Sequence, residues 1–571
     1  MDVRRPVCDY FAIIGYDPAS GLKQERIAEF GDNLSTDCGT PVRKSPLVAT
    51  YEPKVIAHFP AERPNRPFTP EIASLALPQG IRLRTEKNVP REPSFHSFVV
   101  IREDGTRIYG CSLIFFEELS SIELRQQMYV SNFSFNAQLA YLREFASGGP
   151  STSSPNDDLS PEGLLFEHRP EQEDEMAKNC GQHRSPYHQS IAQKYTTHSL
   201  PRKFGIRIDF AKTGGAYSAV NVGGAGADPA DSWREEEHVA YYKNPKSPMF
   251  ISKCLAIVTP IPIIYSSENL LHNLWALINE KCPLKEYSLE DLLHWMLHEL
   301  YLPAPSTLAQ LSFSGFHLLL RVPPPGEMPY FDYPIETLFA HISVDQFVKL
   351  LTSFMLEQQI LLISRNARNL MLIAECLSVL VFPFCWQMPY CPILPHTQLK
   401  FLEAPIPWLM GICVGEQQLP KQQLYQVCNI CLLDVDSRQL EVPEDLPSFP
   451  RQHRIISEIN ALLSRSAAAA SSQIDQKQED GVHAFYLKGL QFNAVIRELF
   501  LDHFVSLFST YEGYLLHAGT EHGGMVSVPK SRRKNGRMFR ESTANFDKIS
   551  FLVDQPESVL SFLSAFLETQ V

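Results

Sequence analysis

The sequence contains no Gly-Lys pair and no G-x-S-x-G pattern in its 571 residues. A phosphate-binding P-loop requires Gly-Lys followed by Ser or Thr, and an α/β-hydrolase presents its nucleophile within G-x-S-x-G. The absence of both patterns argues against a P-loop NTPase and against an α/β-hydrolase. Neither class of enzyme has local support in this sequence.

Long hydrophobic runs are also missing. The beginning of the chain, Met1 to Pro6, does not form the apolar core and cleavage site of a signal peptide. The longest apolar stretch, residues 370–382, has 13 residues and contains Glu375, whereas a membrane-spanning helix needs about 20 apolar residues. The sequence therefore predicts a cytoplasmic protein without a transmembrane helix.

The sequence has fewer basic residues than acidic residues. The chain has 51 Lys and Arg residues against 64 Asp and Glu residues, and its formal net charge is -13, so binding to nucleic acid is not expected. A solvated loop is the default interpretation of the one strongly basic segment, and contact with an anionic membrane or an acidic partner is the alternative. The cations of this segment are Lys530, Arg532, Arg533, Lys534, Arg537 and Arg540.

Residues 1–148 are predicted to form strands followed by one helix. Tyr10–Gly15 and Lys54–Phe59 are short runs of β-forming residues. Residues 95–102 and 106–116 flank an Asp-Gly pair, which favours the tight turn of a β-hairpin. The second arm of this hairpin has apolar residues on both faces, so both faces should be covered. A helix is expected at 121–144, which lacks Pro and Gly.

Residues 149–246 are predicted to form a disordered insertion. The segment is rich in Ser, Gly and Pro at its beginning, acidic at 171–175 and rich in Gly at 223–228. Such a composition buries too little apolar surface to offset the entropy of ordering the chain. A buried strand is expected at 251–262, so the blocks on the two sides of the insertion should be neighbours in the fold.

Residues 247–464 have the pattern of an α/β core. A continuous apolar strand at 359–364 is followed closely by a helix that has no polar face, and such a βα unit is buried inside an α/β sheet. The expected elements of this block are helices at 269–280, 289–300, 344–357 and 370–382 and strands at 311–322 and 359–364.

The polar loop between this strand and this helix is a candidate binding site. It contains Arg365, Asn366, Arg368 and Asn369, and it lies between two of the most apolar elements of the chain. In α/β sheets, ligands and partners bind at the loops that leave the carboxyl ends of the strands. We expect both arginines to be exposed. The alternative is that their charges only keep the loop soluble.

Residues 465–482 are predicted to be a linker, and residues 483–571 a helical region. The linker begins with an alanine run and continues with polar residues. Beyond it, apolar residues between Phe492 and Tyr511 recur with the spacing i, i+3, i+4, i+7 of an amphipathic helix. A last helix is expected at 559–567.

Two pairs of potential metal ligands have incomplete patterns. His294 and His298 are four residues apart, but the Glu of the H-E-x-x-H zinc motif is missing between them. Cys428 and Cys431 form a single C-x-x-C without a second pair. We expect histidines that are partly buried or at the rim of the core, and cysteines inside it. We expect neither a metal nor a cofactor.

Several passages, taken in their order along the chain, resemble the tripartite DENN domain family. They are REPSFHSFVVIREDGTRIYG at 91–110 for the upstream region, EQQILLIS at 357–364, VFPFCW at 381–386, PILP at 392–395 and APIPWLMG at 404–411 for the central region, and NFDKISFLVDQP at 545–556 for the downstream region.

Within this family, the sequence is most similar to the DENN domain-containing protein 5 subfamily. The segment Asp434-Val435-Asp436 and residues 440–447 support this choice. That subfamily continues into PLAT and RUN domains, which have no counterpart among these residues.

The resemblance implies a fold that is α/β in its centre and α+β overall. The upstream domain at 1–148 would be longin-like, the central domain at 247–464 α/β, and the downstream region at 483–571 helical. The implied function is that of a guanine-nucleotide exchange factor, which promotes GDP release from a Rab-family small GTPase and regulates vesicle trafficking. A DENN-fold scaffold or effector that binds a small GTPase without exchange activity is the alternative.

The resemblance also implies how such a protein would act and where. An exchange factor works by differential binding and needs no covalent chemistry and no cofactor. The loop with Arg365, Asn366, Arg368 and Asn369 would contact the GTPase. The basic segment would contribute peripheral contact with Golgi or endosomal membranes.

Deletion of residues 151–236 should leave the melting temperature of the protein nearly unchanged, because the predicted insertion contributes little to the core. Differential scanning calorimetry of the deletion variant and the full chain tests this expectation. A large fall in melting temperature would show that the segment packs against the rest of the protein.

Overall fold

The computed structural model describes residues 5–25, 47, 49–63, 66–102, 105–119, 248–279, 288–313, 316–324, 326–414, 430–471, 478–517 and 544–570. One structural unit contains all of them. The helix predicted at 121–144 and the insertion predicted at 149–246 lie outside the described residues.

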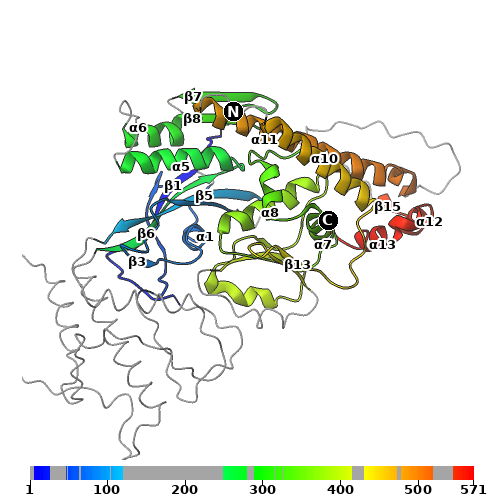
Figure 1. Ribbon diagram of the computed structural model, residues 1–571, viewed down its shortest axis with the longest axis horizontal. Helices are drawn as coiled ribbons and strands as arrows, with labels where there is room; N and C mark the ends of the chain where they lie inside the picture. Colours follow the sequence, from blue (N-terminus) through cyan, green and yellow to red (C-terminus); the bar gives the residue numbers. More distant parts are fainter. Residues whose placement is uncertain are drawn as a thin grey trace, which may run out of the picture. The chain divides into compact units, whose positions relative to one another are not determined.

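The first sheet is antiparallel and is assembled from both sides of the predicted insertion (Figure 1). Its strands lie in the order β2 (Lys54–Phe59), β1 (Tyr10–Gly15), β6 (Met249–Thr259), β5 (Arg107–Glu118) and β4 (Ser94–Ile101), and β3 (Leu83–Thr85) also pairs with β6.

β6 lies in the middle of this sheet. Its Leu255 is opposite Ile13 of β1 on one side and opposite Leu113 of β5 on the other. Nearly all of its residues are buried, as expected for a strand covered on both faces. The sequence assigns this strand to the central domain, but its backbone pairing places it in the sheet of the upstream domain. The expectation that the two blocks are neighbours is thereby confirmed.

The predicted Asp-Gly hairpin is confirmed as β4 and β5. Phe98 lies opposite Gly110 in the register of the two strands. Gly105 in the turn has a φ of 77°, a conformation that Gly adopts without steric strain. A Cβ atom at Gly110 would lie only 2.1 Å from the ring of Phe98, so Gly110 leaves the space that this ring occupies on the sheet.

Both faces of the hairpin are covered, as the sequence predicts. The short helix α1 (Ile72–Ala76) contacts β4 and β5 on one face. The helices α5 (Ile264–Ile278) and α8 (Ala367–Leu380) contact β5 and β4, respectively. Because side chains alternate along a strand, Phe98 and Gly110 face the α1 side, and Phe95 faces α8.

The second sheet is the predicted α/β core. Its order is β10 (Tyr390–Cys391), β11 (Leu409–Cys413), β9 (Ile360–Ser364), β12 (Cys431–Asp434) and β13 (Gln439–Glu441). Within this sheet β10, β11, β9 and β12 are parallel, whereas β13 is antiparallel to β12. The apolar strand predicted at 359–364 is β9, at the centre of the sheet.

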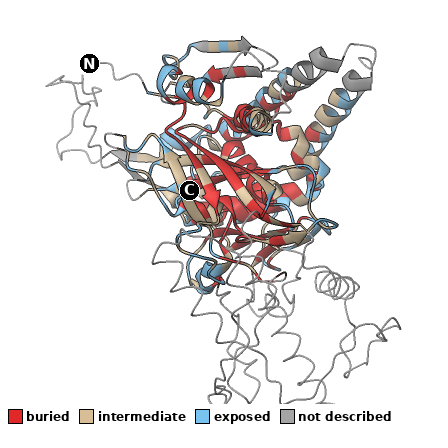
Figure 2. Cartoon of the chain, turned by 90° about the vertical axis from the view of Figure 1, so that its left-hand side faces the viewer, coloured by how far each residue is buried: buried red, intermediate tan, exposed pale blue. Residues whose placement is uncertain are grey.

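The helices before and after β9 in the sequence are both largely buried. α7 (Val344–Met355) precedes the strand and begins with a capping box between Ser343 and Gln346. α8 follows it and has buried residues on nearly all sides. Figure 2 shows how the buried residues, in red, run through the sheets and the inner helices. Short 3-10 helices lie at Ile335–Ala340 and His396–Glu403.

The segment between α5 and α7 differs from the prediction at one point. α6 (Leu289–His294) continues into a π-helical turn, Trp295–Glu299, close to the predicted helix. The single strand predicted at 311–322 is instead a hairpin of β7 (Leu308–Phe313) and β8 (Phe316–Arg321). Ser-Gly between the two arms is a turn signal inside an otherwise apolar run.

Residues 331–335 join α5 to the downstream helices. One carboxylate oxygen of Asp332 accepts from the backbone N–H groups of Ile264 and Tyr265 at 2.7 and 3.2 Å, and the other accepts from the N–H of Ser266 at 3.3 Å. This carboxylate satisfies donors that a helix leaves unpaired in its first turn. On the other side, Asn493 accepts from the N–H of Ile335 at 2.7 Å.

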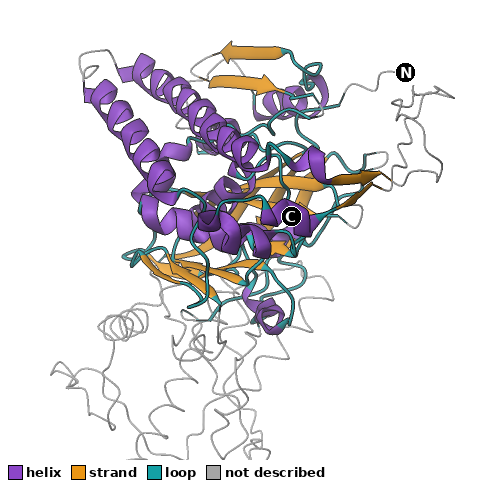
Figure 3. Cartoon of the chain, turned by 90° about the vertical axis from the view of Figure 1, so that its right-hand side faces the viewer, coloured by secondary structure: helices purple, strands orange, loops and turns teal. Residues whose placement is uncertain are grey.

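The described residues of the linker predicted at 465–482 are helical. α10 (Gln452–Ser471) continues through the alanine run, and α11 (Gln478–Phe508) begins within the predicted linker. Ala has the highest helix propensity of all residues, so the run extends the helix. α10 and α11 contact each other and are the two long helices in Figure 3.

An aromatic cluster joins the downstream helices to the central domain. The ring of Phe384, which follows α8, lies 5.4 Å from Phe504, 5.4 Å from Phe508 and 5.0 Å from Phe566 in edge-on contacts. Phe504 and Phe508 belong to the predicted amphipathic helix. The remaining elements are the 3-10 turn Tyr511–Tyr514, β14 (Leu515–His517), β15 (Ala544–Phe546), α12 (Lys548–Val553) and α13 (Glu557–Phe566).

Among the helices that the structure describes, none combines the length and the apolar character needed to span a membrane.

Substitution of Gly411 by Ala should destabilise the protein by roughly 1–3 kcal/mol, the usual cost of overpacking a core. A Cβ atom at this position in β11 would lie 2.0 Å from the carbonyl oxygen of Pro392. Gly513→Ala is the matched control, because nothing lies within 4 Å of the added Cβ. Urea denaturation of both variants tests this, and equal stabilities would contradict the close approach.

Candidate functional site

The turn after β9 lies where the parallel strands of the second sheet end. The carboxylate of Asp436, just beyond β12, accepts hydrogen bonds from the hydroxyl of Ser364 at 3.0 Å and from the N–H of Arg365 at 2.7 Å. The N–H of Asn366 donates to the hydroxyl of Ser364 at 3.1 Å. Two neighbouring strands therefore fix the backbone of this turn.

The predicted polar loop is shorter in the structure. Asn366 is the N-cap of α8, and its side-chain oxygen accepts from the N–H of Arg368 at 3.0 Å. Arg368 and Asn369 lie in the first turn of the helix. Asn is among the best N-cap residues, and this signal defines the beginning of α8 better than the apolar periodicity does.

Arg365 and Asn366 are exposed, as the sequence predicts. The side-chain oxygen of Asn366 accepts a hydrogen bond within its own turn, from the N–H of Arg368. The backbone N–H groups of Arg365 and Asn366 are bound as well. The turn thus presents a cation and an amide on a fixed backbone.

Arg368 contradicts the expectation of exposure. Its guanidinium forms an ion pair with Glu268 of α5 at 2.9 Å and donates from Nε to the hydroxyl of Tyr333 at 2.7 Å. It also lies over the rings of Phe95 and Tyr333, at 5.7 and 5.3 Å from their centroids. Only 34% of its side chain is exposed, and 15% of that of Glu268.

This arginine therefore joins α8 to α5 and to the first sheet. Burial raises the pKa of Glu268, and the charge of Arg368 opposes that rise. Asn369, the last residue of the predicted site, is partly buried.

A second arginine joins the far end of α8 to the first sheet. Arg107, the first residue of β5, donates to the hydroxyl of Ser378 at 3.0 Å and lies 4.8 Å from the centroid of the Tyr390 ring. Tyr390 in turn donates to the carboxylate of Glu375 at 2.7 Å. Burial raises the pKa of Glu375, while the charge of Arg107 and this hydrogen bond lower it.

The other residues singled out in the sequence lie apart from this site. The basic segment from Lys530 to Arg540, and Cys428, lie outside the described residues. Cys431 is buried in β12, as expected, and the aromatic residues Trp386 and Trp408 are buried too. His294 and His298 lie with ring centroids 5.1 Å apart, and His294 is 3.4 Å from the carboxylate of Glu299 on the surface. The described residues include no group of three or more potential metal ligands.

Sequence patterns miss the residues that fix this site. Asp436 lies in a short acidic motif of the sequence, but its partners Ser364 and Arg365 are about 70 residues away. The sequence around Glu268 is typical of a helix and the sequence around Tyr333 is typical of a loop, so neither segment indicates a binding role. Nothing local to Arg368 indicates that it reaches them.

Two domain families match this chain. Residues 53–115 match the uDENN domain, and residues 250–438 match the DENN (AEX-3) domain. The second match begins inside β6, so this strand belongs to the central region by sequence and to the first sheet by pairing.

The matching relatives are DENN domain proteins that share part of their length with this chain. DENN domain and WD repeat-containing protein SCD1 of Arabidopsis thaliana is 26% identical over 294 residues, or 49% of this chain and 24% of the relative. DENN domain-containing protein 2B of Mus musculus is 25% identical over 44% of this chain and 20% of the relative. DENN domain-containing protein 1A of Homo sapiens is 28% identical over 34% of this chain and 18% of the relative. The likeness to the protein 5 subfamily stays a prediction.

Reversal of the charge of Arg368 should destabilise the protein by roughly 2–4 kcal/mol, because Glu268 would lose its partner and face a like charge in a partly buried place. Arg368→Lys should cost less, since it keeps the charge but loses the planar contacts with the aromatic rings. Chemical denaturation of Arg368→Glu, Arg368→Lys and Arg365→Glu tests this.

Arg365→Glu is the control, and its effect should stay within about 0.5 kcal/mol, as for most surface substitutions. Equal losses in Arg368→Glu and Arg365→Glu would show that the ion pair with Glu268 does not form in solution.

Proposed function

The chain belongs to the DENN domain family, and on this basis we propose that it is a guanine-nucleotide exchange factor that promotes GDP release from a Rab-family small GTPase. The observation that carries this proposal is the occurrence of the uDENN and DENN domains in order along one chain. Nucleotide exchange on Rab GTPases in membrane trafficking is the known role of the family. Because each matched stretch covers a quarter or less of its relative, the activity of the whole protein is part of the proposal.

Exchange requires differential binding rather than bond cleavage. A GTPase that holds GDP with nanomolar affinity is stabilised by about 12 kcal/mol. The exchange factor must therefore bind the nucleotide-free GTPase much more tightly than the loaded one. By thermodynamic reciprocity, binding of GTP then weakens the contact with the exchange factor and releases it. No side chain has to act as a nucleophile, and no cofactor is needed.

The turn of Arg365 and Asn366 fits one part of a GTPase-binding surface. It lies at the carboxyl ends of parallel strands, where α/β proteins bind their partners. Its backbone is held by Asp436, so the turn does not need to be ordered on binding. Arg368 supports this turn from within through Glu268, and Asn369 lies on the adjoining helical turn.

The proposed setting is the cytoplasm, at the surface of Golgi or endosomal membranes. A Rab GTPase acts at a membrane, so its exchange factor has to work close to one. The cations between Lys530 and Arg540 would supply attraction to anionic lipid, worth about 1 kcal/mol per charge near the surface.

The purified chain should accelerate release of fluorescent GDP from at least one member of a panel of Rab GTPases and should leave intrinsic GTP hydrolysis unchanged. Arg365→Glu should slow this release by about tenfold, the effect of losing one charge-assisted hydrogen bond. The melting temperature of the variant should equal that of the wild type.

Arg438→Glu would be a poor control, because Arg438 donates to the carbonyl of Ala340. Lys349→Glu is better matched, since Lys349 lies on the outer side of α7 in an exposed pair with Asp345. Stable binding to a Rab without acceleration would favour the scaffold alternative. Unchanged release by Arg365→Glu would remove the turn from the interface and leave the exchange activity standing.

A further inference from the structure

Residues 329–335 form a connecting segment between α11 and the helices of the candidate site. The part from Phe331 to Ile335 is buried throughout. Up to Pro334 the segment has neither helix nor strand. Since no ladder of backbone hydrogen bonds fixes its position, the contacts on its two sides have to do so.

α11 holds the connecting segment by hydrogen bonds from one face of the helix. The side chain of Asn493 donates to the carbonyl of Tyr333 at 2.8 Å and accepts from the N–H of Ile335 at 2.7 Å. Arg497, four residues later and therefore on the same face, donates to the carbonyl of Pro329 at 2.6 Å. The backbone of the segment is thus tied to α11 at both of its ends.

Close packing adds to these hydrogen bonds one turn earlier in α11. Gly489 lies four residues before Asn493 and faces Pro334. A Cβ atom at Gly489 would lie 2.8 Å from the Cβ of Pro334, which is well below the usual contact distance of about 3.5–4.0 Å between carbon atoms. A displacement of α11 must therefore move the connecting segment or break these contacts.

The other side of the connecting segment sets both partners of Arg368. Tyr333 binds the guanidinium directly, since Nε of Arg368 donates to its hydroxyl group at 2.7 Å. Asp332 binds the backbone of the first turn of α5. Glu268, further along α5, forms the ion pair with Arg368 at 2.9 Å. Two adjacent residues thus position the two groups that hold this arginine.

We propose that the connecting segment transmits the position of α11 to the turn of Arg365 and Asn366 and thereby regulates GDP release. Arg368 lies in the first turn of α8, and its N–H donates to the side chain of Asn366, the N-cap. A shift of the segment withdraws the hydroxyl of Tyr333 and moves Glu268, so the turn loses its support.

The regulatory consequence is that a partner which displaces α11 slows exchange without touching the turn. This effect on GDP release rests on the proposed function, whereas the coupling of α11 to the turn does not. The two are therefore measured separately.

The first measurement is amide hydrogen exchange of the full chain, read by mass spectrometry of peptides that cover residues 364–369. Tyr333→Phe removes the hydroxyl group that binds Arg368, and Gly489→Ala places a methyl group against Pro334. Each variant should exchange these amides about fivefold faster, the effect of losing one hydrogen bond on a local opening. Because α11 also contacts α8 directly, Tyr333→Phe tests the connecting segment rather than that contact.

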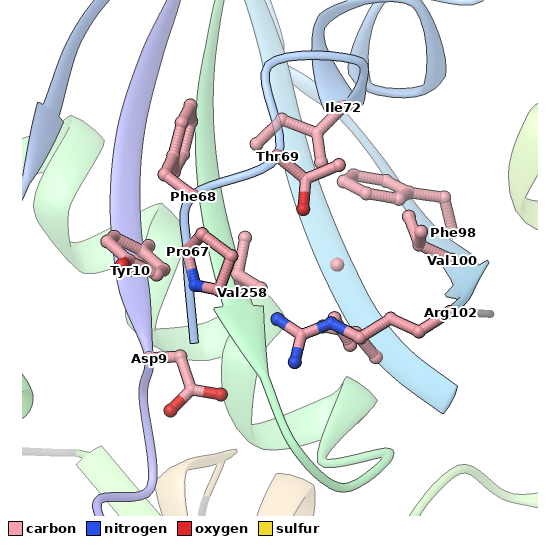
Figure 4. A pocket seen from close by; sticks show the side chains of 12 residues that line it. Asp9, Tyr10, Pro67, Phe68, Thr69, Ile72, Phe98, Val100, Arg102 and Val258 are labelled. Carbon is pink, nitrogen blue, oxygen red and sulfur yellow. The ribbon is translucent and has the colours of Figure 1, made fainter. Parts of the chain in front are cut away.

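Two matched controls distinguish coupling from a general loss of stability. Tyr10→Phe also removes a hydroxyl group from a buried tyrosine, since Tyr10 donates to the carbonyl of Arg66 at 2.6 Å. Figure 4 shows Tyr10 in the wall of a small hollow on the face of the first sheet that carries α1. Gly513→Ala adds a methyl group where nothing lies within 4 Å. Neither control should change hydrogen exchange at residues 364–369.

The second measurement is release of fluorescent GDP from the Rab GTPase that responds to the wild-type chain. Tyr333→Phe and Gly489→Ala should each lower kcat by about fivefold and leave KM unchanged, because the turn acts on the nucleotide-free state. In an Arg365→Glu background they should slow release by less than about twofold further, since they act through the turn that Arg365→Glu already disables.

Unchanged hydrogen exchange at residues 364–369 in Tyr333→Phe would overturn the proposal, and so would an equal increase in Tyr10→Phe. Full additivity of Tyr333→Phe with Arg365→Glu in GDP release would show that the segment does not act through the turn. If the wild-type chain releases GDP from no Rab GTPase, the proposed function fails, and hydrogen exchange alone decides whether α11 is coupled to the turn.

Discussion

The return of the chain into the middle of the first sheet sets the position of everything that follows it. β6 pairs with β1 and with β5, and without it both neighbours would have unpaired backbone groups in a buried place. α5 follows β6 directly, and Asp332 binds the backbone of its first turn. Glu268 in that helix then holds Arg368 of α8. The position of the exposed Arg365 therefore depends on a strand far earlier in the chain.

Two arginines hold α8 between the sheets, in opposite directions. Arg107 extends from the first sheet to the end of α8, where it lies by Ser378 and Tyr390. Arg368 extends from the beginning of α8 to α5 and lies over Phe95 of the first sheet. Loss of either arginine would leave a carboxylate without its counter-charge, which is more costly than the pair itself is stabilising. Such contacts at both ends fix the rotation and the register of α8, and hence the surface at its N-terminus.

Local patterns are sufficient where the cause of a structure is local. The Asp-Gly hairpin, the apolar β9 and the amphipathic α11 follow from turn chemistry and from hydrophobic periodicity. The alanine run misleads because low complexity resembles a linker, although Ala favours helix. The position of the turn after β9 is predictable, since it ends a buried strand, and its role as a binding site is a proposal. The partial burial of Arg368 is not, because Glu268 is 100 residues away in sequence and no local pattern reports a long-range ion pair.

The contacts around α8 bear on how exchange would work. Under the proposed function, the preference for the nucleotide-free GTPase has to come from a change of shape in one of the two partners. The turn of Arg365 is bound by Asp436, and α8 is held at both ends, so this side of the interface is already ordered. The change of shape is then expected in the GTPase. An ordered surface that fits only the open GTPase directs its binding energy to that state, and contacts of this kind increase the rate of release rather than the affinity for the loaded form.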